Sequence, residues 1–516
     1  MRKRWYRLFI WFVFIFSIFL STRLLLGKGL SRSIPIFFDG EHLERSENAH
    51  LQQELPTGKT RRTRVKLSTK ILGVKLLVRW VRPTRTPCST RVTVLAESAA
   101  YIAAGWAERT RVSFGDAARA AKSGAPLYAA GSYMAGKQMK NLSFCNWHYS
   151  LPHEFFYSSS EIIFSPEAGD KGPYRILPLI IAYKSKIIEQ LPQITLCTHS
   201  TADQVYSIVE LARRWEGPLS FSIFAPGLDA GLAVALLDRA CHCEPTMFKV
   251  SVHLIFPTGR PPALGDFSQY NKDDCAASDL QWREADTERK QRKMTYPINV
   301  ARNIARLKSK TERVLVSDIE LLPSLNLASG FEEMLKERIT KINVVFVLPV
   351  FEIEANQMPP VNKNQLLDAI KDGSAVYFHR YVCPHCQRFP GLTRKWLLRP
   401  NSGKVKPLIV TREFPNHRWE PVFIGTKNDP LYTEDMTWEG RQDKMAQIFE
   451  MCLMNYRLII LDGAFLVHTP GIKRKIISNN NKTPLIRAQE RRNGRIYQNV
   501  IKRLLKQFHS NRKCKQ

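Results

Sequence analysis

From about residue 174 onward the sequence alternates short apolar runs with amphipathic stretches, and this alternation limits the possible folds more than any other feature. The short apolar runs predict strands over 174–183, 194–199, 219–225, 249–256, 313–321, 342–351 and 458–468. The stretches between them predict helices over 202–215, 228–240, 299–307, 331–339 and 441–455. Strands separated by helices favour an α/β fold with a mostly parallel central sheet covered by helices on both faces.

The N-terminus carries a candidate membrane anchor. Arg2, Lys3, Arg4 and Arg7 precede an apolar segment over 8–26 that only Arg23 interrupts. With Arg23 extended toward the headgroups, this segment is long enough for a transmembrane helix. The excess of bases before it predicts a cytosolic N-terminus and a lumenal remainder. A cleaved signal peptide is the alternative, which the aromatic-rich run and the absence of a small-x-small cleavage site disfavour.

This topology predicts four parts: a cytosolic tail over 1–7, a transmembrane signal anchor over 8–26, a lumenal stem and N-terminal extension over 28–170, and a catalytic domain over 171–516. An alanine-rich stretch over 96–130 is a candidate helix within the extension.

The formal net charge of +31 is concentrated near the ends of the chain. Residues 55–96 contain bases and no acid, and the tail from Lys473 onward contains Glu490 as its only acid. Three interpretations stay open: nucleic-acid binding, attraction to anionic glycans or membrane headgroups, and a solvated basic surface. No zinc-finger spacing, RNA-binding signature or helix-turn-helix pattern supports the first, so no nucleic-acid partner is expected.

A lumenal body agrees with the glycosylation sequons and the cysteines. Asn141 and Asn481 begin Asn-x-Ser/Thr sequons, and ten cysteines are available for disulfides in an oxidising lumen. For the Cys383-Pro-His-Cys386 motif, a local disulfide or two unrelated cysteines is expected. A redox site lacks its usual strand–helix context, and a zinc site lacks a second ligand pair of suitable spacing.

The triplet Asp318-Ile319-Glu320 lies at the end of the predicted strand over 313–321. Side chains at i and i+2 of a strand share a face, so both carboxylates should project together from the sheet edge where α/β folds bind ligands. Two hard oxygen ligands suit Mn²⁺ or Mg²⁺ and leave positions for a diphosphate. His468, at the end of another predicted strand, is a third candidate metal ligand. An exposed strand end with no ligand is the alternative.

The segment 437–444 supplies candidates for a catalytic base. Glu439 and Asp443 lie where a turn leads into a predicted helix, whose N-terminus favours an ionised carboxylate. Trp438 in the same segment could form an apolar wall for a sugar ring. The alternative is an ordinary capped helix with a core tryptophan.

The candidates for donor binding lie just before the acid triplet. Arg302, Asn303 and Arg306, on the predicted helix over 299–307, are placed to reach a nucleotide or phosphate, and Ser317 adjoins the triplet. An amphipathic helix with solvated arginines is the alternative.

Over roughly residues 190–510 the chain resembles glycosyltransferase family 49. The motifs that carry the resemblance, in the order seen in that family, are Tyr-Pro-Ile-Asn-Val-Ala-Arg-Asn at 296–303, Val-Ser-Asp-Ile-Glu-Leu-Leu-Pro-Ser at 316–324, Asn-Lys-Asn at 362–364, Trp-Glu-Gly at 438–440, Asp-Lys at 443–444 and Phe-Leu-Val-His-Thr-Pro-Gly at 465–471. The ordered set is specific, although no single motif is.

The resemblance implies a GT-A fold, a type II Golgi topology, a UDP-sugar donor, Mn²⁺ (with Mg²⁺ as the alternative) and inversion at the anomeric carbon. It places Asp318 and Glu320 at the family's Asp-x-Asp, His468 at the metal-binding histidine and Asp443 at the catalytic base. Glu320 departs from the family's second aspartate, and its longer arm bears on metal affinity and donor choice.

We therefore expect a Golgi type II glycosyltransferase that transfers a sugar, glucuronic acid as first choice, to a glycan or glycoprotein acceptor, anionic acceptors included. N-acetylglucosamine and xylose are the alternative sugars. The expected partners besides the acceptor are the Golgi membrane and other glycosyltransferases. The alternative from a different class is a catalytically inactive lumenal protein that binds glycans or scaffolds other transferases.

Overall fold

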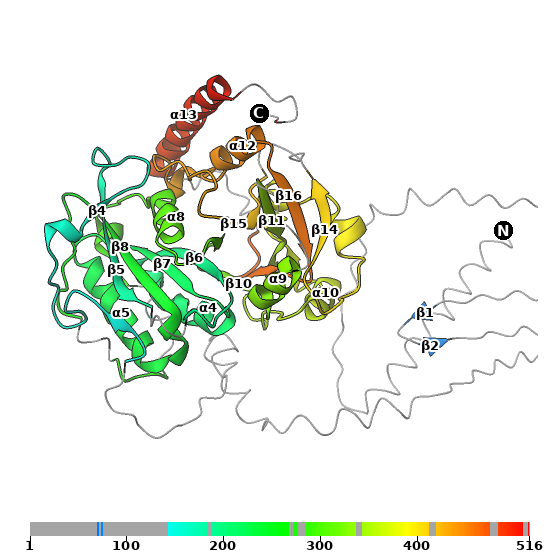
Figure 1. Cartoon of the computed structure of the whole chain (residues 1–516), viewed down its shortest axis with the longest axis horizontal. Coiled ribbons are helices and arrows are strands. Elements are labelled where there is room, and N and C mark those ends of the chain that lie inside the picture. The colour runs from blue at the N-terminus through cyan, green and yellow to red at the C-terminus, as the bar shows by residue number, and fades with distance from the viewer. Residues whose placement is uncertain are drawn as a thin grey trace, which may run out of the picture. The chain divides into compact units, whose positions relative to one another are not determined.

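The computed structural model of the chain describes residues 70–71, 74–75, 143–183, 188–267, 270, 272–276, 285–336, 343–411, 419–474, 483–508 and 514. The chain divides into two compact units, Met1–Thr110 and Arg111–Gln516. Of the first unit the structure describes a short antiparallel hairpin, β1 (Lys70–Ile71) with β2 (Val74–Lys75). The other described elements belong to the second unit (Figure 1).

A sheet of eleven strands forms the centre of the second unit (Figure 1). Its spatial order is β14-β16-β11-β15-β9-β6-β7-β8-β5-β3, with β4 beside β5. The run β9-β6-β7-β8 is parallel, as is the pair β11 and β16, and the other pairs are antiparallel. The α/β prediction is confirmed, but the sheet is mixed. Its strands are β3 (Asn146–Trp147), β4 (Ile163–Phe164), β5 (Tyr174–Ala182), β6 (Ile194–Thr201), β7 (Leu219–Phe224), β8 (Val250–Pro257), β9 (Arg313–Val316), β11 (Val344–Leu348), β14 (Lys406–Thr411), β15 (Val422–Thr426) and β16 (Arg457–Asp462).

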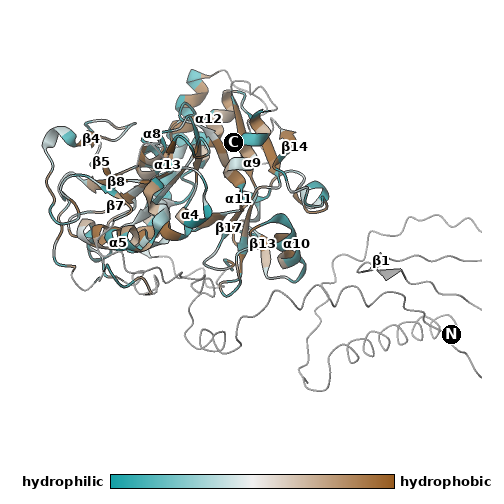
Figure 2. Cartoon of the chain, turned by 60° about the horizontal axis from the view of Figure 1, so that its bottom comes forward, coloured by the Kyte–Doolittle hydropathy of each residue, from teal (hydrophilic) through white to brown (hydrophobic). Residues whose placement is uncertain are grey.

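Helices cover both faces of the parallel run because its strands are apolar on both sides. Phe221 and Ile223 of β7 face one layer, formed by α4 (Ile208–Arg214) and α5 (Asp229–Cys243). Phe224 of the same strand faces the other layer, formed by α8 (Ile298–Leu307). The strands appear mostly brown, the colour of hydrophobic residues, between these helices (Figure 2). This two-sided burial matches the prediction for parallel strands.

A smaller sheet, in the order β10-β17-β12-β13, adjoins the large one. It contains β10 (Leu321–Pro323), β17 (Leu466–His468), β12 (Val350–Ile353) and β13 (Ala375–Tyr377). Three predicted single strands are in fact pairs of strands, β9 with β10, β11 with β12 and β16 with β17. In each pair the first strand enters the large sheet and the second enters the small one. The junction between the sheets is therefore crossed three times.

Each crossing has a local cause. After β9, residues 318–321 form a turn in which the Leu321 N–H donates to the Asp318 carbonyl at 3.0 Å. Pro349, which has no N–H for a sheet ladder, separates β11 from β12. Gly463, between β16 and β17, has φ 79°, and a Cβ there would lie 2.4 Å from the Lys404 carbonyl oxygen. The apolar runs continue through all three breaks because both halves are buried, so periodicity alone misses them.

The predicted helices are present with adjusted bounds. The segment 202–215 starts as a 3₁₀ helix, η4 (Ala202–Ser207), before α4, and the segment 441–455 shortens to α12 (Met445–Leu453). The long α13 (Pro484–Gln507) was not predicted. The other helices are α7 (Glu288–Gln291), α9 (Leu327–Lys336), α10 (Lys363–Lys371), α11 (Pro384–Gln387), the π-helical segment η6 (Leu392–Trp396) and the 3₁₀ helices η3 (Ser159–Glu161), η5 (Pro245–Lys249) and η7 (Trp438–Gly440).

Several predictions fall outside the described residues. They are the anchor over 8–26, the alanine-rich stretch over 96–130 and the sequons at Asn141 and Asn481. Among the described helices, none combines the length and apolar character needed to cross a membrane.

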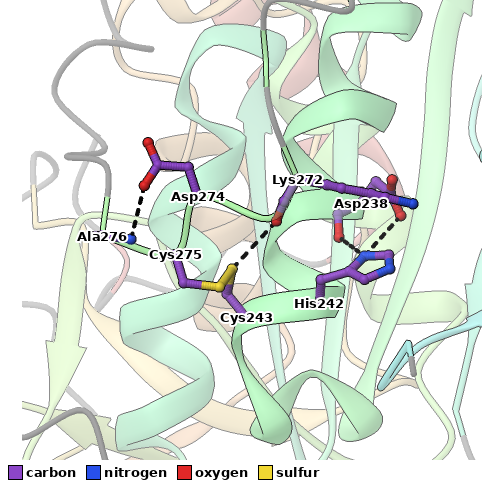
Figure 3. The surroundings of a disulfide bond; sticks show 7 residues. All are labelled: Asp238, His242, Cys243, Lys272, Asp274, Cys275 and Ala276. Atoms are coloured by element: carbon purple, nitrogen blue, oxygen red, sulfur yellow. Dashed lines mark hydrogen bonds and ion pairs between the residues drawn. A yellow bond between two sulfur atoms is a disulfide. The ribbon is translucent and has the colours of Figure 1, made fainter. Parts of the chain in front are cut away.

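Four disulfides join described cysteines, and Cys197 is free and buried. Cys383–Cys386 is the local disulfide that the sequence predicted. Cys243, at the end of α5, is bonded to Cys275, and its sulfur lies 3.5 Å from the Lys272 carbonyl oxygen (Figure 3). The cysteines of the Cys383–Cys386 and Cys243–Cys275 disulfides have no free thiolate with which to ligate zinc. The four are Cys145–Cys241, Cys243–Cys275, Cys383–Cys386 and Cys452–Cys514.

Candidate active site

The acid triplet lies in a turn at the carboxyl edge of the parallel strands, directly after β9. The prediction that Asp318 and Glu320 lie on one strand is wrong. The buried Ser317 fixes the turn to the large sheet, since its N–H donates to the Cys197 carbonyl of β6 at 2.9 Å. Strand periodicity therefore does not orient the two carboxylates, and each has its own set of partners.

Asp318 faces three nitrogen-bearing side chains. Its Oδ1 lies 3.1 Å from Arg302 Nη2 and 3.3 Å from His199 Nε2, and its Oδ2 lies 3.3 Å from Lys444 Nζ. Burial alone would raise the pKa of Asp318, but Lys444 and Arg302 hold it well below its usual value. The His199 ring is fixed from its other side, where Nδ1 lies 2.8 Å from the Tyr296 hydroxyl. Asp318 is thus a permanent anion among cationic groups.

Arg302 joins Asp318 to Asp443. Its guanidinium is 2% exposed, and Nη1 lies 3.1 Å from Asp443 Oδ2. Burial opposes the charge, yet Asp443 and Asp318 raise the pKa of Arg302. Asn299 supports the arrangement, because it accepts from Arg302 at 2.9 Å and donates to the Asp443 carbonyl at 2.8 Å. Asp443 lies just before α12, as predicted, but Arg302 is a partner of protein carboxylates rather than an exposed donor ligand.

Glu320 meets His468 at the first strand pair of the small sheet, where His468 Nε2 lies 3.2 Å from Glu320 Oε2. On its other side His468 Nδ1 lies 3.2 Å from the Gly471 carbonyl oxygen. Because a carbonyl can only accept, Nδ1 carries a proton and donates to it. The contact between Nε2 and Glu320 is then bridged either by a second ring proton or by a cation, and imidazole with carboxylate is a suitable ligand pair for a divalent cation.

A buried carboxylate lies on the strand next to this pair, but among the described residues it does not complete a three-ligand cluster. Glu352 of β12 is the register partner of His468 and is fully buried. Its Oε2 accepts from the Lys473 N–H at 3.3 Å, while Oε1 has no hydrogen-bond partner within the described part of the chain. Burial raises the pKa of Glu352. No three acidic, histidine or cysteine side chains converge as a ready-made metal cluster among the described residues, so Glu320 and His468 form the pair that fits an ion here.

Glu439 anchors the start of α8. Both of its carboxylate oxygens accept from the Tyr296 N–H, at 3.2 and 3.1 Å, and one also pairs with Arg289 at 2.8 Å. Its neighbour Trp438 is 57% exposed, and the Trp438 N–H donates to the Tyr296 carbonyl at 3.1 Å. Glu439 thus positions the segment that reaches His199, whereas Trp438 is exposed rather than the core tryptophan of the alternative.

Asn303 and Arg306 lie outside the centre. The Asn303 amide donates to the Tyr432 carbonyl at 2.8 Å, and Arg306 donates to the Pro430 and Asp429 carbonyls, each at 2.9 Å. Both are buried, so this face of α8 holds the loop over 429–434 instead of contacting solvent. The structure therefore does not bring these two residues together with Asp318.

Glu420 is a candidate that sequence reasoning missed. Burial, followed by the charge of Asp443, raises its pKa to about 7, while Lys444 and Arg302 act in the opposite direction. Its main chain is held by α11, because the Glu420 N–H donates to the Cys386 carbonyl at 2.8 Å. No motif marks Glu420, since its relation to Asp443 exists only in the folded chain.

The centre thus brings together three chemical capacities. Glu320 and His468 can ligate a divalent cation, Lys444 offers a positive charge for an anion, and Glu420 can change its charge near neutral pH. All lie where the two sheets meet.

Comparisons with known proteins agree with a glycosyltransferase. A family model described as glycosyl-transferase for dystroglycan, of glycosyltransferase family 49, matches residues 193–510. Beta-1,4-glucuronyltransferase 1 of Danio rerio is 30% identical over 290 residues, which cover 53% of this chain and 66% of that protein. The Homo sapiens protein of the same name is 26% identical over 333 residues, covering 62% and 77%.

More distant similarities extend the comparison. Xylosyl- and glucuronyltransferase LARGE2s of Danio rerio is 21% identical over 320 residues, covering 61% of this chain and 36% of that protein. Among solved structures, S. aureus TarS 1-349 matches with a TM-score of 0.28 and 11% identity, covering 53% of this chain and 60% of that one. A TM-score this low carries no argument about the fold.

Proposed function

Because this chain belongs to glycosyltransferase family 49, we propose that it transfers a sugar from a UDP donor to a glycan acceptor with inversion, in a divalent-cation-dependent reaction. A GT-A arrangement of the sheets and a type II position in the Golgi membrane are part of the proposal. The four disulfides support an oxidising compartment such as the Golgi lumen.

The observation that carries the proposal is the Glu320–His468 pair beside Asp318. With an Nε2–Oε2 separation of 3.2 Å, the pair places an imidazole nitrogen and a carboxylate oxygen, two ligand types suited to a divalent cation, side by side. Mn²⁺ held there would neutralise the diphosphate of the leaving nucleotide. Glu320 is 34% exposed and Asp318 35% exposed, so both carboxylates are accessible to a ligand.

The remaining charges suit a nucleoside diphosphate. Lys444 is held beside the centre by Asp318 at 3.3 Å, and its side chain is 14% exposed, so it can bind a phosphate oxygen with little reorganisation. Arg302 keeps Asp318 and Asp443 in fixed positions at 3.1 Å each. Trp438, largely exposed, offers an apolar surface on which a sugar ring can stack.

In the transfer step the hydroxyl oxygen of the acceptor forms a bond to the anomeric carbon, while the bond from that carbon to the phosphate oxygen of UDP breaks. A base must take the proton that the hydroxyl loses. Glu420 and Asp443 are the candidates. Asp443 is already neutralised by Arg302, whereas Glu420 has a pKa of about 7, close to the optimum for a base at neutral pH. We therefore propose Glu420 as the base, with Asp443 as the alternative.

Glucuronic acid is the proposed donor sugar, because the names of the similar curated proteins specify glucuronyl transfer. Xylose, named for the LARGE2s relatives, and N-acetylglucosamine are the alternatives within the same class. A glycan or glycoprotein acceptor, anionic acceptors included, and other Golgi glycosyltransferases are the proposed partners.

A second candidate function is a catalytically inactive glycan-binding member of the family. The observation in its favour is that Asp318 is occupied by Arg302 and Lys444 rather than grouped with Glu320 and His468. In that case the cationic groups would have replaced the metal instead of assisting it.

The test is UDP release by the purified full chain. The panel would contain UDP-glucuronic acid, UDP-xylose and UDP-N-acetylglucosamine, each with and without Mn²⁺. The proposal is supported if one donor releases UDP only in the presence of Mn²⁺. This release should be lost in Glu320→Gln and kept in the exposed control Glu189→Gln. Absence of both release and UDP–Mn²⁺ binding by calorimetry would favour the inactive alternative.

A further inference from the structure

Helix α13 is fixed to the second unit by one apolar face. Tyr497, Val500, Ile501 and Leu504 are buried in a cluster that also contains residues of α12, and α13 lies beside α12 at the periphery of the unit (Figure 1). Asn493, fully buried, adds hydrogen bonds from α13 to the segment 437–441. The opposite face is thereby held toward solvent in a fixed orientation.

That exposed face carries a continuous row of bases, which we call the α13 stripe. At 3.6 residues per turn, its five members fall within an arc of about 100°. The stripe extends about 28 Å along the helix, at ~1.5 Å per residue. A surface depression of the unit is lined by stripe residues together with Gln498 and Asn499. The five members, all exposed, are Arg487, Arg491, Arg495, Lys502 and Lys506.

The charge of the stripe is not neutralised within the described part of the protein. Nearby acids pair with bases beside the stripe: Glu490 with Arg441 at 3.4 Å and Glu167 with Arg503 at 3.9 Å. No stripe residue forms an ion pair with a described acid. A row of like charges held on a rigid helix repels itself, and an external polyanion would relieve that repulsion.

The shape of the stripe favours a linear polyanion over a membrane. An amphipathic helix binds a lipid surface by inserting its apolar face, but here that face is buried against α12. Single-stranded nucleic acid would be stacked on aromatic side chains, and the α13 aromatic residue, Tyr497, is buried. A straight row of cations about 28 Å long instead matches an extended chain with regularly spaced carboxylates.

We propose that the α13 stripe binds a linear oligosaccharide bearing carboxylate groups along its length. The choice of a glycan rests on the proposed function, since a uronic acid transferase would meet such chains as acceptor or product. The stripe is a site separate from the Asp318 centre, and it would retain an acidic glycan near the enzyme between transfers.

The test is binding of the full chain to a size-graded series of oligosaccharides with alternating glucuronic acid residues, at low and high salt. In the stripe variant, glutamine replaces all five bases, from Arg487→Gln to Lys506→Gln. The matched control removes the same charge from exposed bases elsewhere: Lys171→Gln, Lys310→Gln, Arg394→Gln, Lys395→Gln and Lys406→Gln.

Exposed charge pairs contribute a factor of about 1.5 to 5 each, so the loss of five should weaken binding by about eightfold to three-thousandfold. The control should lose far less. Affinity should rise with oligosaccharide length until the chain covers about 28 Å and should fall with salt.

Three results would overturn the inference: equal losses in the two variants, unchanged binding by the stripe variant, or stripe-dependent binding to phosphatidylserine vesicles or single-stranded DNA but not to the oligosaccharides. UDP release from the donor is measured on the same proteins and should be the same in the stripe variant and the wild type. A wild type that binds the glycan but releases no UDP would count against the proposed transferase and not against the stripe.

Discussion

Asn493 makes the buried hydrogen bonds by which α13 holds the segment that precedes Asp443, and its removal should weaken both the fold and the activity. Its amide nitrogen donates to the Thr437 and Arg441 carbonyls at 2.9 and 2.8 Å, and its oxygen accepts from the Thr437 N–H at 3.2 Å. At about 1 kcal/mol net for each hydrogen bond, Asn493→Ala should lower the free energy of unfolding by about 3 kcal/mol.

Gly440 provides an independent check of the same contact. A Cβ at Gly440 would lie 2.2 Å from both Cγ and Nδ2 of Asn493 and 2.5 Å from Oδ1. Gly440→Ala should therefore cost about 1–3 kcal/mol through overpacking. In the double variant the clashing atoms of Asn493 are absent, so its stability should be close to that of Asn493→Ala alone. The coupling energy between the two substitutions should then be about 1–3 kcal/mol.

Urea unfolding of the four proteins, followed by tryptophan fluorescence, measures this coupling, and UDP release reports the accompanying effect on the centre. Additive losses in the two single variants would refute the argument that Asn493 and Gly440 share one closely packed contact. Normal activity in Asn493→Ala, at a temperature where it is folded, would refute the link between α13 and Asp443.

The remaining predictions concern the centre and the disulfides. Glu320→Gln should abolish Mn²⁺-dependent UDP release while circular dichroism stays unchanged, and retained Mn²⁺-dependent release would remove Glu320 from the site. If Glu420, whose pKa is about 7, is the base, kcat/KM should rise with pH through that value, and Glu420→Gln should lose about 10²–10⁴-fold in rate. The folded-state pKa of Glu420 lies above the usual glutamate value, so ionisation of Glu420 lowers the stability of the protein as pH rises from that value to about 7. Glu420→Gln should therefore raise Tm at pH 8 and leave Tm unchanged at pH 4. Removing the Cys145–Cys241 disulfide, whose sequence separation is 96, should lower the free energy of unfolding by about 4–5 kcal/mol. Removing Cys383–Cys386, with a separation of 3, should lower it by about 1–2 kcal/mol. Equal losses in urea unfolding would contradict this order.

The parallel half of the fold could be predicted from the sequence because local pattern and tertiary environment agree there. The runs at 194–199, 219–225 and 249–256 are short and apolar, and each is one strand of the parallel run. Prediction failed where one apolar run serves two sheets. The break at Pro349 has a visible signal in the missing N–H. The turn at Asp318 has none, since apolar buried residues stand on both sides of it, at 314–315 and 321–322.

The sequence predicted which residues belong to the candidate site better than it predicted the contacts between them. Asp318, Glu320, His468 and Asp443 lie near the sheet junction, but no sequence pattern indicated that Arg302 would form ion pairs with two of them. Glu420 illustrates the limit, because its raised pKa comes from burial and from Asp443, which is distant in sequence. Such shifts depend on tertiary contacts that no local pattern encodes.

The contacts that build the centre join residues remote in sequence, with separations of 126 for Asp318 and Lys444, 148 for Glu320 and His468 and 150 for Arg289 and Glu439. Closing such long loops is slow compared with forming local helices and hairpins. During refolding, compaction of the β6–β8 region should therefore precede the appearance of enzymatic turnover. Turnover would then be a kinetic reporter of the last native contacts, and no fragment ending before β17 could show it.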